Sequence, residues 1–390
     1  MSVSGPVSAP VGSDVPDPAD AAGRAETTDR AHPWAPALRW GFGVALAHRA
    51  LLGVWMGLVW ALLSGYLPIQ FASSELADPI LPPLNRLQSI VFGVWRRWDA
   101  THYLRLARAG YTNPDVGSTV FGPLTPLCIH LLDLILPSPV DLAAMVFATL
   151  SFGLALTMLY RVGEVYYHDR ALGQQAIILT ALLPLSFFFS APMSDALFLA
   201  LALGLFYAAS EGRWWLAACF GFLGALTRNQ GVMLLGVGGL ILLENQPPAM
   251  PWVERLIDGI KRGWPLHVIP LGYGLFVWYR QSLSLPPMAE AYENYSYVFF
   301  SNPVYGVWAN LRWIATHLPG SLLKVDHLAL FVTVGLSVLL IADPKHRRPA
   351  LIAYTLGYLL LFVSKLNWLF GTDQVAYSVS LARYSLSLFP

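Results

Sequence analysis

The residues best suited to chemistry lie in the stretch RRWDATHYLRLARAGY, residues 96–111, which holds an acid, a histidine, two tyrosines and four arginines. No glycine or proline interrupts residues 94–109, and this pattern predicts one helix. On that helix Asp99 lies three residues before His102 and four before Tyr103, so the three side chains share a face. A carboxylate beside an apolar boundary, with arginines nearby, can accept a proton from an incoming hydroxyl group. Asp99 and His102 are therefore candidate catalytic residues.

The same stretch also fits an amphipathic helix that lies in a membrane interface. Trp98 would then be one of its aromatic anchors, and Asp99 would pair with an arginine on the surface. The residues by themselves leave both interpretations open.

Two other polar interruptions stand inside apolar sequence. In FFFSAPMSDALF, Asp195 opens a membrane helix after Pro192. An ionisable residue at membrane depth is a functional candidate, but an acid at a helix N-terminus is also a favourable cap, and Ser194 could cap equally well. In ALTRNQGVMLL, Arg228 and Asn229 separate two short apolar runs. An arginine in that place can bind a phosphate or extend its guanidinium group to the surface.

Composition identifies the kind of chain that must position these residues. Of 390 residues, 56% are hydrophobic and 12% are charged, which is about half the charged share of an ordinary soluble domain. This indicates an all-α polytopic membrane protein. The net charge of +1 gives no sign of a nucleic-acid partner. No metal-ligand cluster, glycine-rich phosphate loop or nucleophile elbow is apparent in the sequence.

Apolar runs long enough to approach the thickness of a bilayer give about ten hydrophobic segments. Residues 1–38 precede them as a polar tail that we expect to be disordered and not a cleaved signal, and residues 39–390 are expected to form one transmembrane domain. Two long loops, 68–118 and 281–325, are expected on the outer side, the first with interfacial helices. The candidate segments are 47–67, 119–137, 139–160, 171–190, 194–210, 213–227, 231–243, 264–280, 326–342 and 350–366.

The orientation follows from lysine and arginine in the short loops, which favour the cytoplasm. Loops DPKHRRP and ENQPPAMPWVERLIDGIKRG are therefore expected to be cytoplasmic, and alternation then places Asp195, Arg228, loop 281–325 and the segment after 366 outside. If the N-terminal tail is cytoplasmic and loop 68–118 lies outside, strict alternation of the loops between the two sides miscounts by one membrane crossing. Segment 119–137 contains three prolines, a histidine and an aspartate, so we expect that it does not cross fully.

Five stretches in the same order resemble the PIG-V-like family of GPI mannosyltransferases, within the GT-C superfamily of membrane glycosyltransferases. WDATHYLRLARAGY resembles the family's WD-x-x-H-(F/Y) motif, and FGPLTPL is similar to a later proline-containing stretch, with Gly122 inserted. FFFSAPMSDALF, ALTRNQGVMLL and RYSLSLFP resemble the remaining three. Together they lie within residues 95–390. Members usually continue with membrane helices after the last stretch, so this chain is either truncated or builds its donor groove differently.

The resemblance implies a GT-C-like bundle and an inverting transfer of a sugar, expected to be mannose, from a polyprenyl phosphate to a lipid-linked or glycan hydroxyl. Asp99 would be the general base, and arginines outside the membrane would bind the leaving phosphate. No cofactor is implied, and metal dependence stays open. The candidate substrate-binding residues are Trp98, Tyr103, Arg96, Arg97, Arg105, Asp195, Arg228, Asn229, Arg383 and Tyr384.

A carrier or flippase for a lipid-linked sugar is the alternative function. It would place polar residues near mid-membrane in paired broken helices, whereas here they concentrate on one side. The expected partners are the bilayer, the sugar donor and the acceptor. The composition of the tail favours a bacterial cell membrane, and the endoplasmic reticulum is the eukaryotic alternative.

Overall fold

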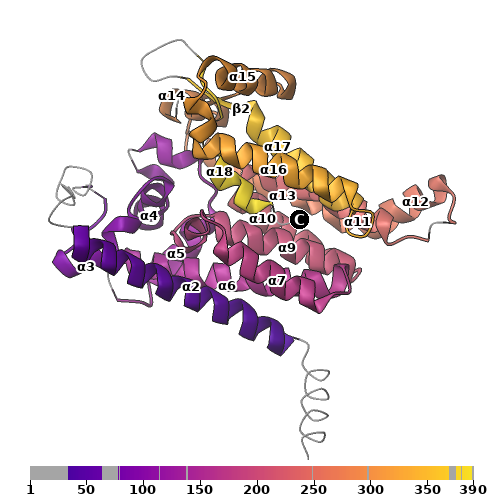
Figure 1. Cartoon of the computed structure of the whole chain (residues 1–390), viewed down its shortest axis with the longest axis horizontal. Helices are drawn as coiled ribbons and strands as arrows, with labels where there is room; N and C mark the ends of the chain where they lie inside the picture. Colours follow the sequence, from indigo (N-terminus) through magenta and orange to yellow (C-terminus); the bar gives the residue numbers. More distant parts are fainter. Residues whose placement is uncertain are drawn as a thin grey trace, which may run out of the picture.

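The structure is a computed structural model, and it is mostly helical (Figure 1). The expected tail lies outside the described residues up to residue 33, as do residues 64–77 of the first outer loop. The residues described are 34–63, 78, 80–113, 115–137, 139–247, 249–296, 298–368, 375–378 and 380–388.

Three described helices are long and apolar enough to cross a membrane: α2 (Trp34–Leu63), α6 (Val140–Tyr166) and α16 (Val325–Ala342). The first begins well before the expected residue 47, so residues 34–38 are helical and do not belong to a tail. Shorter apolar helices accompany them, in agreement with the expectation of a mostly helical membrane protein. They are α5 (Leu124–Asp133), α9 (Asp195–Ser210), α10 (Trp214–Thr227), α11 (Leu234–Glu244) with the turn η4 (Asn229–Met233) before it, and α17 (Pro349–Ser364). The helices α7 (Arg170–Leu182), α8 (Phe187–Ser190) and α13 (Ile269–Ser282) lie between them in the sequence.

The core forms where α6 packs against α2, α7 and α9, and where α9 packs against α10. Large buried side chains fill it, among them Phe152 of α6 and Phe198 and Phe206 of α9. Tyr354 and Tyr358 of α17 belong to the same apolar cluster, so the last long helix is packed onto the first half of the bundle. Close packing of these buried side chains holds the helices together.

Segment 119–137 contains only the short helix α5 (Leu124–Asp133) as a regular element after the 3-10 turn η3 (Val116–Val120). At 1.5 Å per residue, a ten-residue helix spans about 15 Å, half of the hydrocarbon thickness. This agrees with the expectation that the segment does not cross fully.

The predicted helix over residues 94–109 is divided in the structure. It consists of the turn η1 (Gly93–Trp95) and the helix α4 (Asp99–Ala109), preceded by α3 (Arg86–Val91) and followed by η2 (Gly110–Thr112). The break falls at Trp98, whose φ of 52° is a conformation that bulky residues seldom adopt. Sequence periodicity does not show such a break, and it makes Asp99 the first residue of α4.

Two short strands depart from the all-α expectation. β1 (Val298–Phe300) pairs antiparallel with β2 (Lys365–Asn367), with Phe300 opposite Lys365. They join the loop after α13 to the end of α17. The same region holds α14 (Met288–Ser296), α15 (Pro303–Thr316), η6 (Gly320–Leu323), α18 (Leu381–Tyr384) and η7 (Ser385–Ser387).

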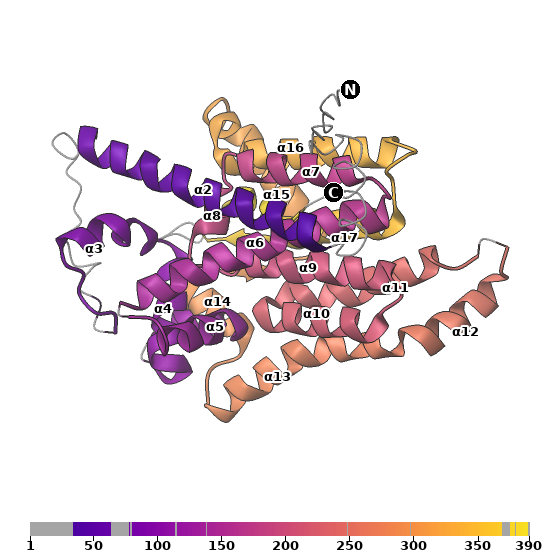
Figure 2. The ribbon, with the colours of Figure 1, turned by 90° about the horizontal axis from the view of Figure 1, so that it is seen from below.

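The two ends of the bundle carry different elements. Helices α3, α4 and α14 lie at one end, and α12 (Trp252–Gly263) projects at the other, as Figures 1 and 2 both show. The turn η5 (Trp264–Val268) connects α12 to α13. The end with α4 and α14 is the one that carries the polar residues described next.

Candidate active site

Four charged side chains from distant parts of the sequence form a continuous chain of ion pairs. Arg383 of α18 donates through Nη1 to Asp99 and through Nε and Nη2 to Asp195 Oδ2, at 3.0 and 2.6 Å. Arg228 Nη2 donates to the other oxygen of Asp195 at 2.7 Å. Asp195 is fully buried, so its charge requires these two partners.

Two hydroxyl groups extend this cluster. Ser194 Oγ accepts hydrogen bonds from Tyr103 OH at 2.7 Å and from Arg228 Nε at 2.8 Å. Ser194 makes no side-chain cap on α9. The capping interpretation of Ser194 is therefore wrong, and its hydroxyl group holds Tyr103 and Arg228. Asp195 does stand in the first turn of α9, and its carboxylate also binds two arginines.

A cavity of about 50 Å³ lies beside the cluster. Asp99, Tyr103, Arg228, Asn229 and Tyr384 line it, so five of the residues singled out in the sequence meet there. Arg228 does not reach the surface, because it is only 8% exposed. The remaining lining residues are Val120, Phe121, Gly122, Thr227, Gln230, Phe276, Met288, Tyr292, Phe300 and Lys365.

Gly122 explains how the chain that follows the first outer loop comes so close to Arg228. A Cβ atom at this position would lie 2.4 Å from the carbonyl oxygen of Thr227 and 2.5 Å from that of Leu226. No side chain fits there, so the glycine permits contact between the loop and the end of α10. This brings the stretch that carries Phe121 against the residue that precedes Arg228.

Asp99 is held in its charged form. Desolvation inside the protein would raise the pKa of this carboxyl group, but the charge and hydrogen bond of Arg383 outweigh it and keep the pKa below its ordinary value. The side chain is 32% exposed, and its Oδ1 has no hydrogen-bond partner among the described residues. Asp99 therefore offers a free, ionised oxygen to the cavity.

Lys365 is the functional candidate that the sequence did not reveal. Its Nζ donates to Tyr384 OH at 2.6 Å and lines the cavity, and its charge also lowers the pKa of Asp99. It ends an apolar helix in the sequence, where a lysine is commonly an interfacial residue. The pairing of β2 with β1, which turns Lys365 toward the site, has no signal in the sequence that we recognise.

Other predicted substrate-binding residues lie elsewhere. Arg96 donates twice to Asp141 of α6, at 2.7 Å each, in a buried ion pair that ties η1 to the bundle. Arg105 pairs with Asp78 and Asp115. Neither arginine lines the cavity, and neither does Arg97.

Trp98 and His102 lie next to the cavity without lining it. Trp98 is 64% exposed, and its ring contacts those of Phe187 and Phe188. His102 stacks against Phe121, which does line the cavity, at 5.1 Å between ring centroids. No group of three or more His, Cys, Asp or Glu side chains that could hold a metal ion is present in the part of the chain that is described.

A comparison with protein families gives one match. Residues 61–244 match the family model of the mannosyltransferases named PIG-V. This part of the chain belongs to the PIG-V mannosyltransferase family. The PIG-V match supports glycosyltransferase activity, and the apolar helices are consistent with a membrane protein. No curated protein and no solved structure matches the chain.

The PIG-V region contains Asp99, Asp195 and Arg228 but ends before α17. Lys365, Arg383 and Tyr384 come from beyond it. The structure thus connects the family region with a second segment through the ion pairs of Arg383.

Proposed function

We propose that the protein is an inverting mannosyltransferase that takes mannose from a polyprenyl phosphate and attaches it to a hydroxyl group of a lipid-linked or glycan acceptor. The proposed place is the outer face of the membrane, in a GT-C-like bundle. The composition of the N-terminal tail favours a bacterial cell membrane.

The balance of charge around the cavity is the observation that carries this proposal. Three cations, Arg228, Arg383 and Lys365, stand against two carboxylates, Asp99 and Asp195. No carboxylate pairs with Lys365 among the described residues, and Arg228 Nη1 is buried without a hydrogen-bond partner in the described part. A site with a surplus positive charge and an unused guanidinium nitrogen suits an anionic group such as a phosphate.

Asp99, which also lines the cavity, is the proposed base. In the proposed reaction Asp99 Oδ1 accepts the proton of the acceptor hydroxyl while the oxygen attacks the anomeric carbon and the phosphate departs. Lys365 and Arg228 stabilise the negative charge that develops on the phosphate. Attack from the side opposite the leaving group inverts the anomeric configuration, as expected for a single displacement.

The test is Asp99→Asn in the full-length enzyme, assayed by release of polyprenyl phosphate from a radiolabelled polyprenyl-phosphate mannose with total membrane glycolipids as acceptor. We expect turnover to fall by about 10²–10⁴, because an amide cannot accept the proton. The matched control is Asp133→Asn, which also removes a carboxylate paired with an arginine of α4. Wild-type turnover in a folded Asp99→Asn enzyme would exclude Asp99 as the base.

A further inference from the structure

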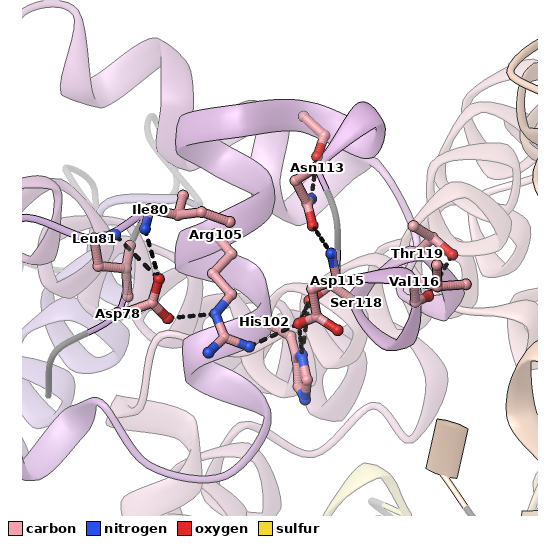
Figure 3. A network of polar contacts seen from close by, with 11 residues as sticks. Asp78, Ile80, Leu81, His102, Arg105, Asn113, Asp115, Val116, Ser118 and Thr119 are labelled. Atoms are coloured by element: carbon pink, nitrogen blue, oxygen red, sulfur yellow. Dashed lines mark hydrogen bonds and ion pairs between the residues drawn. The ribbon is translucent and has the colours of Figure 1, made fainter. Parts of the chain in front are cut away.

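A polar network beside the cavity holds His102. Its Nδ1 lies 2.8 Å from Ser118 Oγ and 3.3 Å from Asp115 Oδ2 (Figure 3). Ser118 Oγ in turn donates to Asp115 Oδ2. Both partners come from the loop around η3, whereas His102 belongs to α4.

These contacts define which ring nitrogen carries the proton. An ionised carboxylate can only accept hydrogen bonds, and the hydroxyl of Ser118 is already donated to Asp115, so His102 Nδ1 must be the donor. The hydrogen bond from His102 is the main reason why the pKa of Asp115 lies well below its usual range, with Ser118 and Arg105 acting in the same direction. In the neutral imidazole, Nε2 is then a free acceptor.

The free nitrogen points away from Asp115, as Figure 3 shows, and it has no hydrogen-bond partner among the described residues. Helical spacing puts His102 and Asp99 on the same face of α4. They are close enough that the positive charge which His102 carries when it is protonated lowers the pKa of Asp99. The imidazole also stacks on Phe121, which lines the cavity, and the side chain of His102 is 31% exposed.

Asp115 is itself held firmly. Arg105 Nη1 donates to it at 2.7 Å, and the same guanidinium group pairs with Asp78. The backbone N–H of Asp115 donates to the side chain of Asn113 at 2.9 Å. Arg105 therefore acts as a brace for Asp115.

We propose that Asp115 is a positioning residue that orients His102, so that His102 Nε2 receives the proton Asp99 takes from the acceptor and passes it to water. This deepens the proposed glycosyl transfer and rests on it. Asp115 and Arg105 thereby become parts of the active site that never touch the sugar.

The acceptor O–H bond breaks as its oxygen bonds to the anomeric carbon, and the bond from that carbon to the phosphate oxygen breaks with its electrons. The proton moves to Asp99 and then to His102 Nε2, in the direction expected because an imidazole is in general a stronger base than a carboxylate. Release of the proton to water returns both groups to their starting forms.

Single and double variants test this order of transfer. In the assay used for Asp99, Asp115→Asn should lower kcat about tenfold or more while the KM for the donor stays unchanged, and His102→Ala should lower it at least as far. The double variant should be no slower than His102→Ala alone, because both changes remove one unit. Added imidazole should restore part of the activity of His102→Ala, and Asp133→Asn should behave as the wild type.

A purely structural network would give a different result. The proposal would be overturned if the losses of kcat in the two single variants added up in the double variant, or if the donor KM rose. It would also be overturned by a wild-type kcat in Asp115→Asn, or if imidazole did not rescue His102→Ala. Should Asp115→Asn not fold, imidazole rescue of His102→Ala decides alone. If Asp99→Asn were inactive while the His102 and Asp115 variants were fully active, the proton transfer through His102 would be excluded and the proposed glycosyl transfer would stand.

Discussion

At the scale of single residues, Arg383 organises the site because it contacts both carboxylates. Removing a buried partner of this kind leaves an uncompensated charge, which costs about 3–5 kcal/mol. Arg383→Ala would therefore confuse a loss of stability with a loss of binding. Lys365 is the better probe of the phosphate, since no carboxylate among the described residues is paired with it.

Lys365→Met keeps the length of the side chain and removes its charge. We expect the KM for the polyprenyl-phosphate donor to rise about tenfold or more, because a charge-assisted hydrogen bond is worth roughly 1.5–3 kcal/mol. Initial rates at varied donor concentration measure it, with Lys345→Met of an exposed loop as control. An unchanged donor KM would separate Lys365 from the phosphate.

The sequence revealed Asp99, Asp195, Arg228 and Arg383 because charged residues stand out in apolar surroundings. The sequence could not reveal which carboxylate pairs with which arginine. Arg96 and Arg97 sit beside Asp99 in the chain, yet the arginine that binds Asp99 comes from a position 284 residues later. Such pairings depend on the packing of whole helices and leave no local pattern.

At the scale of elements, α18 depends on α16 for its position. Asp326, in the first turn of α16, accepts hydrogen bonds from the backbone N–H groups of Ser380 and Ala382, at 3.2 and 2.9 Å. These are groups at the start of α18, which carries Arg383 and is too short to hold itself.

Asp326→Ala should therefore loosen α18 and lower turnover by about tenfold, because Arg383 would no longer be held against Asp99. Hydrogen exchange of the amides in 380–388 should become faster. Asp343→Ala, at the opposite end of the same helix, supplies the control. Unchanged exchange and turnover in Asp326→Ala would show that α18 is positioned by other contacts.

Elements with long apolar runs were predictable, and the helices α6, α9, α10 and α16 lie close to the expected ranges. Two features were not. The break before α4 arises from the backbone of Trp98, and three-residue strands such as β1 and β2 are too short for a period to be recognised.

At the scale of the whole molecule, the two ends of the bundle are expected to face opposite sides of the membrane. The cavity lies at the end with α4 and α14, and the basic loop after α16 is expected in the cytoplasm. This expectation has a direct test.

Glu293 of α14 and Lys345 are both exposed, and each can be changed to cysteine after Cys128 and Cys219 are replaced by serine. A membrane-impermeant maleimide should label Glu293→Cys in intact cells and Lys345→Cys only after permeabilisation. Labelling of both positions from the same side would contradict the orientation.

The contact between Arg383 and Asp99 also has a consequence for how the protein is made. A ribosome delivers Asp99, Asp195 and Arg228 to the membrane well before Arg383, which must wait until nearly all of the described chain has been translated. During that interval Asp195 has only one of its two guanidinium partners. The ion pairs that join Asp99 and Asp195 through Arg383 can therefore form only after the segment that carries Arg383 has been made.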